Sequence, residues 1–296
     1  MSLTTPSGGI EELVDETSGK EIVLTPPLVD RFADLTKKYE QSLGLGAREV
    51  WARNYVHDVL LPSNINLFLQ QTREYEHHPK YQIHTGYFIS QLIQNSYNAE
   101  NNDFELDMNS LKVMNNVVSN VSGTKERMVR VVITGEIGDE CGYQVQHSTL
   151  TIEKVGRGFG QNAQSSIFTI GEAGDRCGAW AKHSTFTIGK AGGDCGHFAT
   201  RSTFTIEEAG YICGQGAHRS TFTIGEAGYR CGYLAEHSTF IIEKAGDLCG
   251  REAKNSTFKT HNPLQYEQFK EFAPQDTGNT IYLLSRNGSM LKGGEW

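Results

Sequence analysis

Hydrophobic and polar residues follow two different periods along this chain. From residue 26 to about residue 118, apolar residues recur with the spacing of amphipathic helices. From Val129 to Phe258, a single 18-residue pattern occurs seven times and starts an eighth time. A fixed period of this length is typical of a solenoid, because each repeat is one coil that cannot bury its apolar face alone.

The repeat is clearest at His183–Thr200, which starts with His-Ser-Thr-Phe-Thr-Ile. Phe and Ile alternate with Thr in this run, as in a β-strand with one buried face. Eighteen residues are too few for two helices and their turns, so we predict that each repeat forms one turn of a β-helix. Two apolar columns should stack inside it: Leu150, Phe168, Phe186, Phe204, Phe222, Phe240 and Phe258, and beside them Ile152, Ile170, Ile188, Ile206, Ile224 and Ile242. Recurrent Ala-Gly pairs, and a Gly after each Cys, indicate corners with positive φ.

The cysteines share one place in the repeat. They are Cys141, Cys177, Cys195, Cys213, Cys231 and Cys249. Their spacing follows the solenoid period and differs from metal-ligand spacings such as Cys-x-x-Cys. We interpret them as small buried core residues with free thiols. Side chains stacked in register point the same way and suit a disulfide poorly.

Outward threonines form the candidate ligand face of the predicted rod. Its members are Thr185, Thr187, Thr203, Thr205, Thr221 and Thr223, with Thr149 and Thr151 continuing the array. Two parallel files of Thr resemble the Thr-x-Thr faces of insect antifreeze β-helices, and this resemblance implies ice binding. Thr is also an ordinary exposed strand residue that pairs with Thr on the next strand. Interruptions at Ile167, Ile241 and Lys259 favour the second interpretation.

Basic and imidazole side chains alternate just before the strands. His147, His183 and His237 share this position with Arg201 and Arg219. No carboxylate or Ser follows them in a fixed catalytic pattern, so we interpret them as stacked, exposed side chains.

The stretch Ala173–Ile188, followed by Ala191 and Gly192, contains a Gly-Asp pair, a second Gly four residues after the first, and a β-run before the next Ala-Gly. In order and spacing it resembles the glycine-rich repeat of the GXGXG β-helix. That repeat occurs in the C-terminal domain of the glutamate synthase large subunit and in one of the subunits of formylmethanofuran dehydrogenase. The resemblance covers Val129–Phe258, implies a right-handed β-helix used as an interdomain scaffold, and carries over no catalytic residue. A left-handed acyltransferase helix also has eighteen residues per coil, but its hexapeptide pattern is not kept here.

The residues before the repeats predict a mainly α-helical domain at 26–127, preceded by a flexible segment at 1–25. The expected helices lie at Leu28–Tyr39, at Arg48–Leu60, from Ser63 or Asn64 towards Glu74, and at Tyr87–Tyr97. A strand is expected at Phe104–Met108. After it, we expect a helix that Ser110 caps and that includes Leu111, Met114 and Val118. We expect this domain to cap the first coil, since an open coil edge would pair with another chain.

The β-helix is assigned to residues 128–260 and a C-terminal cap to 261–296. The cap should contain a short helix at Leu264–Phe272 and two strands, Thr280–Leu284 and Ser289–Lys292, around an Arg-Asn-Gly turn. The fold class is therefore α+β: a helical N-terminal domain that caps a β-helix with 18-residue coils.

Two groups in the N-terminal domain have residue types that can bind a ligand. The first is His57, His77, His78 and His84, with Glu74 and Glu76 nearby; the second is Arg48, Trp51, Arg53 and Tyr55. The first has no compact metal motif such as His-Glu-x-x-His, so we interpret it as loop and helix-end residues. The second fits a partner contact and inward packing of Trp51 equally well.

Composition and charge limit the partners. The net charge is −8, and residues 1–127 hold 17 acidic and 11 basic side chains, which argues against a general nucleic-acid-binding surface. The chain has no apolar run of membrane-spanning length and no signal-peptide pattern at its start, so we expect a cytoplasmic protein that does not enter membranes.

The sequence contains no nucleophile–base set and no phosphate-binding loop. Our first hypothesis is a non-catalytic scaffold or protein-interaction protein, without cofactor or metal, in which the rod is a spacer and the helical domain contacts a protein partner. The alternative is an accessory domain or subunit of a larger oxidoreductase or glutamate-metabolising enzyme, as the GXGXG resemblance implies. Ice binding through the Thr face is the third hypothesis.

Overall fold

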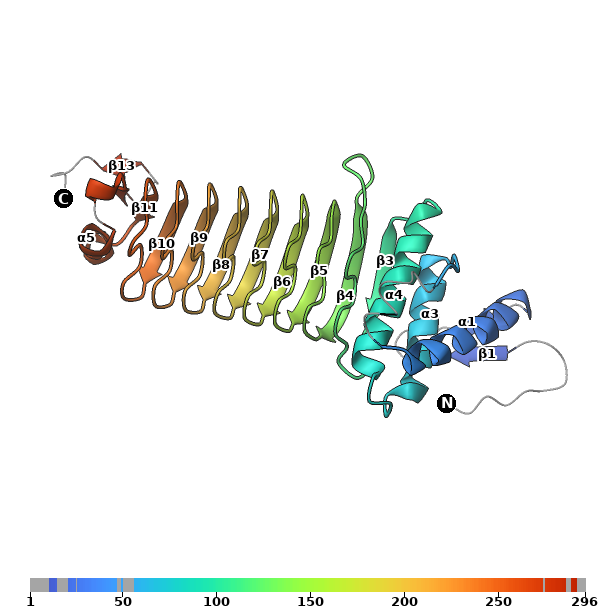
Figure 1. The fold of residues 1–296 in the computed structure, drawn as a ribbon. Helices are drawn as coiled ribbons and strands as arrows, with labels where there is room; N and C mark the ends of the chain where they lie inside the picture. Colours follow the sequence, from blue (N-terminus) through green and yellow to red (C-terminus); the bar gives the residue numbers. More distant parts are fainter. Residues whose placement is uncertain are drawn as a thin grey trace.

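The protein is a straight rod with a helical assembly at one end, as the computed structural model shows (Figure 1). The structure describes residues 11–14, 21–24, 26–46, 49, 56–273, 275–285 and 289–291. A parallel β-solenoid with 18-residue coils, about seven turns long, forms the rod. The predicted α+β class and the predicted solenoid are both confirmed.

In the described part of the N-terminal end, the helices of two turns or more are three, and a short 3-10 helix joins two of them. They are α1 (Pro26–Gly44), α3 (Pro62–Gln71), η1 (Thr72–Tyr75) and α4 (Tyr81–Asn98). Their core is an aromatic cluster in which Tyr39, Phe68 and Phe88 lie with ring centroids 5.2 to 6.0 Å apart. Phe32 packs edge-on against Phe68. The segment 1–25, expected to be flexible, contains two strands, β1 (Glu11–Val14) and β2 (Glu21–Leu24), which pair antiparallel.

The second expected helix, Arg48–Leu60, is wrong over its described C-terminal end. Residues 56–60 have no helical structure, whereas Glu49, near the predicted start, is helical, and the other positions lie outside the described residues. Tertiary hydrogen bonds hold this end: the Val56 N–H donates to Gln91 Oε1, and Asn95 Nδ2 donates to the carbonyl oxygens of Val56 and Asp58. The expected cap at Ser63 or Asn64 is also wrong. Helix α3 begins at Pro62, after an extended Leu61 that makes no side-chain cap, because Pro has the φ of a first helical residue.

The predicted strand at Phe104–Met108 is confirmed as β3 (Asp103–Asp107), which pairs parallel with β4 (Val129–Ile137) and starts the solenoid sheet. The predicted helix after Ser110 is wrong. Its residues form turns in which Asn116, Val118 and Asn120 have positive φ. They are the turn segment of an additional coil, since the Val117 N–H reaches Cys141 Sγ at 3.3 Å in the next coil.

This additional coil is hidden in the sequence because extra residues break its period. Ser122 bridges to Gln146 rather than to the residue eighteen positions later. The extra residues form a loop before β4, closed by a hydrogen bond from the Thr124 N–H to the Arg127 carbonyl. The solenoid therefore begins earlier than the first recognisable repeat.

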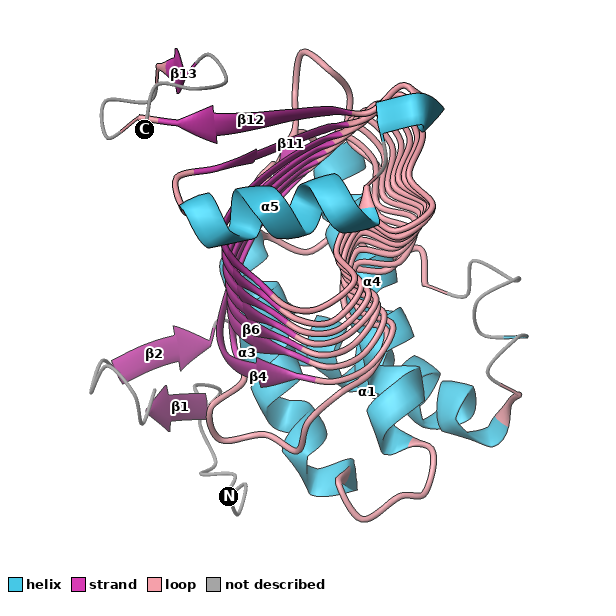
Figure 2. Cartoon of the chain, turned by 90° about the vertical axis from the view of Figure 1, so that its left-hand side faces the viewer, coloured by secondary structure: helices cyan, strands magenta, loops and turns pink. Residues whose placement is uncertain are grey.

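The remaining strands stack parallel and in register. They are β5 (Ser148–Val155), β6 (Ile167–Ala173), β7 (Thr185–Ala191), β8 (Thr203–Ala209), β9 (Thr221–Ala227), β10 (Thr239–Ala245) and β11 (Thr257–Thr260). Figure 2 shows them along one side of the rod, with the turn segments of the coils on the other side.

The Phe column fills the interior as predicted. Rings from Phe168 to Phe258 stack nearly parallel, with centroids 4.4 to 5.2 Å apart. The Gly after each Cys is required by this stack. A Cβ on Gly196 would lie 2.7 Å from the Phe222 ring, and its φ of +67° disfavours other residues.

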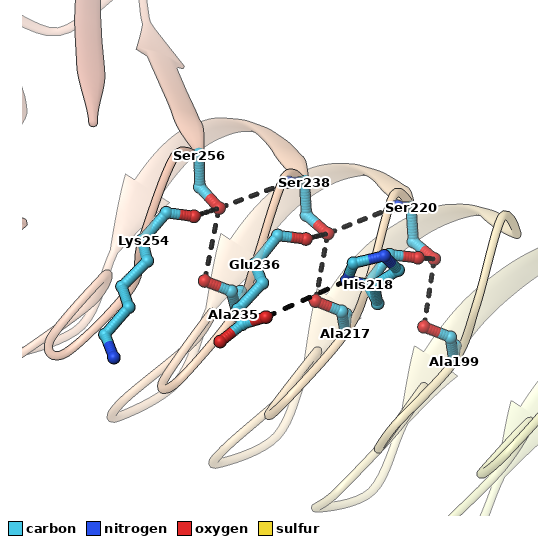
Figure 3. Close-up of polar contacts among 9 residues, drawn as sticks. All are labelled: Ala199, Ala217, His218, Ser220, Ala235, Glu236, Ser238, Lys254 and Ser256. Carbon is cyan, nitrogen blue, oxygen red and sulfur yellow. Dashed lines mark hydrogen bonds and ion pairs between the residues drawn. The ribbon is translucent and has the colours of Figure 1, made fainter. Parts of the chain in front are cut away.

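A column of buried serines joins the coils at the start of the strands (Figure 3). Each Ser N–H donates to the Oγ of the Ser in the next coil, at 3.1 to 3.2 Å. Each hydroxyl in turn donates to carbonyls, as Ser238 does to Ala217 and Glu236 at 3.0 Å. The series ends at Asn279, whose Oδ1 accepts from the Ser256 N–H at 3.0 Å.

The predicted C-terminal cap is present. Helix α5 (Pro263–Phe272) lies across the end of the coil (Figure 2), and its Phe269 contacts Phe258, the last ring of the stack, at 5.4 Å. After η2 (Gln275–Thr277), β12 (Thr280–Leu284) adds a parallel strand to β11, and β13 (Met290–Leu291) pairs antiparallel with β12. The predicted turn at Arg286–Gly288 lies outside the described residues.

Candidate interaction face on the turn side of the rod

Three places in each coil have φ in the left-handed region, and all but two of the residues there, Gly158 and Gly216, are other than Gly. The three places lie one residue before the Cys, three residues after it, and one residue before the buried Ser; in one coil they are Asp194, Phe198 and Arg201, with φ of 56°, 51° and 50°. The side chains at these places point out of the coil, because the residues beside them, Cys195, Ala199 and Ser202, are buried. The outer surface of the turn side is therefore made by positions that vary between coils.

An aromatic cluster covers two neighbouring coils on this side. Trp180 lies edge-on to His197 at 5.4 Å and 6.3 Å from Phe198, and the His197 and Phe198 rings lie 4.2 Å apart. Trp180 is 36% exposed and Phe198 is 45% exposed. Burial lowers the pKa of His197, so its ring favours the neutral form beside two apolar neighbours.

A second cluster lies two coils further along the rod. The Arg230 guanidinium lies 5.0 Å from the ring of Tyr229 and 5.4 Å from the ring of Tyr233. Tyr211 is 50% exposed and lies in the coil between the two clusters, while Tyr229 is 44% exposed. Backbone hydrogen bonds join these turn segments, for instance from the Asp194 N–H to the Tyr211 carbonyl. We call Trp180, His197, Phe198, Tyr211, Tyr229, Arg230 and Tyr233 the aromatic face.

The coils next to these rings hold glycines that make room for them. A Cβ on Gly193 would lie 2.4 Å from the Tyr211 ring, and a Cβ on Gly216 would lie 2.3 Å from the Phe198 ring. Each of these two rings thus lies against a backbone without a side chain. The face is a fitted arrangement of rings and glycines across several coils.

Two rings of the aromatic face lie at a place of the coil that has positive φ throughout the rod. Trp180 and Phe198 have φ of 55° and 51°, where a side chain costs about 1–2 kcal/mol. The equivalent position in the other coils holds Gln144, Asn162, Gly216, Leu234 and Glu252, all with positive φ. The conformation therefore belongs to the coil itself, and the aromatic rings are what distinguishes the two coils of Trp180 and Phe198.

The sequence analysis missed this face, although a signal for it was present. The interior columns keep one residue type through the coils, whereas the turn positions change from coil to coil. Aromatic residues gather at these variable positions between Trp180 and Tyr233. Without the coil geometry, we could not tell that these positions share one surface.

The predicted Thr face exists as a geometric array. Thr185, Thr203 and Thr221 are register partners on β7, β8 and β9, as are Thr187, Thr205 and Thr223. Five of these six side chains are exposed, and Thr221 is half-buried. The structure therefore brings together every Thr that the sequence analysis placed on this face.

The cysteines are buried and free, as predicted. Burial raises the pKa of the Cys141 thiol to about 12. Hydrogen bonding to Cys195, together with burial, raises the pKa of Cys177 and Cys213. Cys141, Cys177 and Cys213 therefore favour the protonated thiol.

The N-terminal histidines do not come together as a metal site. His84 is buried, and its two ring nitrogens lie 3.1 and 3.2 Å from the carbonyl oxygens of Lys80 and Leu45. Burial lowers the pKa of His84. Among the described residues, no group of three or more His, Cys, Asp and Glu side chains is arranged to hold a metal ion. Arg48, Trp51, Arg53 and Tyr55 lie outside the described residues.

Comparisons with family models, with curated proteins and with solved structures gave no match to this chain. The GXGXG interpretation thus stays a resemblance between repeats, while the parallel solenoid itself is shown. In the part of the chain that the structure describes, the helices are too short or too polar to span a membrane.

Proposed function

We propose that this protein is a non-catalytic scaffold that binds another protein through the aromatic face of its rod. The observation that carries this proposal is the set of exposed aromatic rings on the turn side, Trp180, Phe198, Tyr211 and Tyr229, in four successive coils. Trp, Tyr and Arg are the residue types that most often dominate the binding energy of protein interfaces. A rod of stacked coils holds them rigidly, so little conformational entropy is lost on binding.

The proposed contact lies on the rod rather than on the helical domain, to which the sequence analysis assigned it. The helical end and α5 cover the two ends of the coil stack in this proposal, and the turn side presents the contact residues. If the partner belongs to an enzyme complex, the protein serves as the accessory component that the GXGXG resemblance implies.

The test compares two double variants in affinity capture from the native host, with quantitative mass spectrometry. Trp180→Ser with Phe198→Ser removes two rings from the aromatic face. Val132→Ser with Ile167→Ser is the matched control, since these residues are 45% and 44% exposed on the strand side. We expect the first variant to lose a reproducible partner by more than tenfold and the control to keep it. Equal capture by both variants would contradict the aromatic face as the contact.

A second candidate function is ice binding through the Thr face. Its support is the in-register array from β7 to β9, which repeats one pair of hydroxyls on successive strands. Thermal hysteresis of the purified protein tests it, with Thr203→Tyr as the variant that should abolish the effect. We expect no hysteresis in the unmodified protein, and less than about 1 kcal/mol change in stability on this exposed substitution.

A further inference from the structure

The edge of the rod that precedes the strands carries positive charge along several coils. Two neighbouring columns of side chains lie there. One is formed by the residue directly before each buried Ser, and the other by the residue two positions before each buried Ser. In the central and C-terminal coils their members are Lys182, His183, Thr200, Arg201, His218, Arg219, Glu236, His237 and Lys254. We call this the basic edge. It holds four Lys or Arg side chains and one carboxylate in a protein whose net charge is −8.

The other charged column of the rod has the opposite design. On the strand side, one column holds Glu136, Lys154, Glu172, Lys190, Glu208, Glu226 and Lys244, and three ion pairs join neighbours in it: Lys154 with Glu136, Lys190 with Glu208, and Lys244 with Glu226. Glu208 and Glu226 are like-charged neighbours, and the column as a whole has one carboxylate more than it has ammonium groups. Side chains of opposite charge can therefore pair between neighbouring coils, and they do so on the strand side.

Among the described residues, the two arginines of the basic edge form no such ion pairs between coils. Arg201 and Arg219 are register neighbours in successive coils, about 4.8 Å apart along the rod. Like charges placed directly opposite one another destabilise a sheet. Among the described residues, no carboxylate pairs with either of them, and the sole ion pair of the edge joins His218 to Glu236 at 3.9 Å.

The residues two positions before and two positions after each arginine are uncharged. Two residues before them lie Ala199 and Ala217, and two residues after them lie Thr203 and Thr221 of the Thr face. Arg201, Arg219, Lys182 and Lys254 are all exposed. Glu236 is the carboxylate of this edge, and among the described residues its ion pair is with His218 and not with either arginine, so both guanidinium groups can pair with an external anion.

We propose that the basic edge binds an extended acidic segment of a protein partner, laid along the rod axis. From Lys182 to Lys254 the edge spans four coil steps, about 19 Å, which is the length of about six residues of an extended chain. Guanidinium groups bind carboxylates in a bidentate manner, and the adjacent Thr hydroxyls supply hydrogen bonds. This inference rests on the proposed scaffold function and names the chemistry of one partner segment.

A peptide fits this edge better than a nucleic acid does. The rest of the protein carries a negative charge larger than its net value, so a long polymer of high charge density would be repelled beyond the edge. A short acidic segment responds mainly to charges within a Debye length, about 10 Å at 0.1 M salt.

Fluorescence anisotropy of labelled octaglutamate, titrated with the full-length protein at low salt, tests the proposal directly. The variant is Arg201→Gln with Arg219→Gln. The matched control, Lys154→Gln with Lys190→Gln, removes the same charge from the strand side. We expect at least a tenfold loss of affinity in the first variant and less than a twofold change in the control. Arg201→Lys with Arg219→Lys should keep most of the binding.

Several results would overturn the proposal. They are no binding by the unmodified protein, an equal loss in both Gln variants, or tighter binding of a single-stranded oligonucleotide of the same charge. Thermal unfolding of every variant shows that it is folded. Octaglutamate takes the place of the native partner segment in this experiment. If it does not bind, the proposal for the basic edge is contradicted, whereas the proposal for the aromatic face is tested separately by affinity capture. An unmodified protein that binds octaglutamate but captures no partner from the host would instead contradict the scaffold proposal.

Discussion

The interior of the rod and its turn-side surface are built from the same eighteen positions, yet they follow opposite rules. Inside, each residue type stacks on itself, as the Phe column does from Phe168 to Phe258. Outside, the left-handed positions hold Trp180, Phe198 and Gly216 in successive coils. Stacking demands identity because each side chain must fit its own copy one coil away. The surface is free of this demand, so it can differ from coil to coil and carry function.

Removing a ring from the interior should have the largest effect. We expect Phe204→Ala to lower the free energy of unfolding by about 3–5 kcal/mol, because it leaves a cavity in the middle of the stack. Denaturant titration followed by circular dichroism measures this loss.

Leu150 occupies the same column in an early coil, which provides a control. Phe204→Leu should cost less than about 1.5 kcal/mol, because most of the volume is kept. If the Leu variant lost as much as the Ala variant, ring stacking rather than volume would determine the stability of the interior.

The end of the serine series should be the next most sensitive place. Asn279→Ala should cost about 2–3 kcal/mol, because the buried Ser256 N–H loses its acceptor. Asn279→Ser restores the side chain that the other coils use at this position, so its loss should be smaller. Thermal unfolding of the two variants compares them, and equal losses would show that the cap does not continue the serine series.

The cysteines test whether the interior excludes solvent over its whole length. All six thiols should react slowly with a thiol reagent under native conditions and rapidly in denaturant, since all six are buried in the folded protein. Cys213→Ser should cost about 1–2 kcal/mol, because it buries a hydroxyl in an apolar column. Six fast-reacting thiols in the folded protein would contradict the orientation of this column.

A surface substitution should have the smallest effect, and with the opposite sign. Ile212 is a β-branched residue with φ of 58°, which few such residues adopt. Ile212→Asn should raise the free energy of unfolding by about 0.5–1 kcal/mol, because Asn tolerates this conformation. Ile167→Asn, at an ordinary strand position of the exposed surface, should not stabilise. A loss of stability in Ile212→Asn would mean that its packing outweighs its strain.

The hidden coil marks the limit of what a period can predict. Met114, Val117, Val118 and Val121 have apolar spacing compatible with a helix, and the sequence offered no period to contradict it. In the structure all four are buried in turns of a coil. Contacts with the following coil, such as the one from the Val117 N–H to Cys141, decide this conformation. Such contacts cannot be inferred when the register is broken by extra residues.

The sequence by itself determined the solenoid, the identity of its interior columns, the outward Thr files and the buried state of the cysteines. It could do so because a repeated coil places equal residues in equal environments, so period and polarity suffice. Tertiary structure alone decided the additional coil, the role of Asn279 and the aromatic face. Each of these depends on contacts between different residue types, as when the Phe198 ring lies over Gly216. Their identities follow no period, so only the positions of the coils in space bring them together.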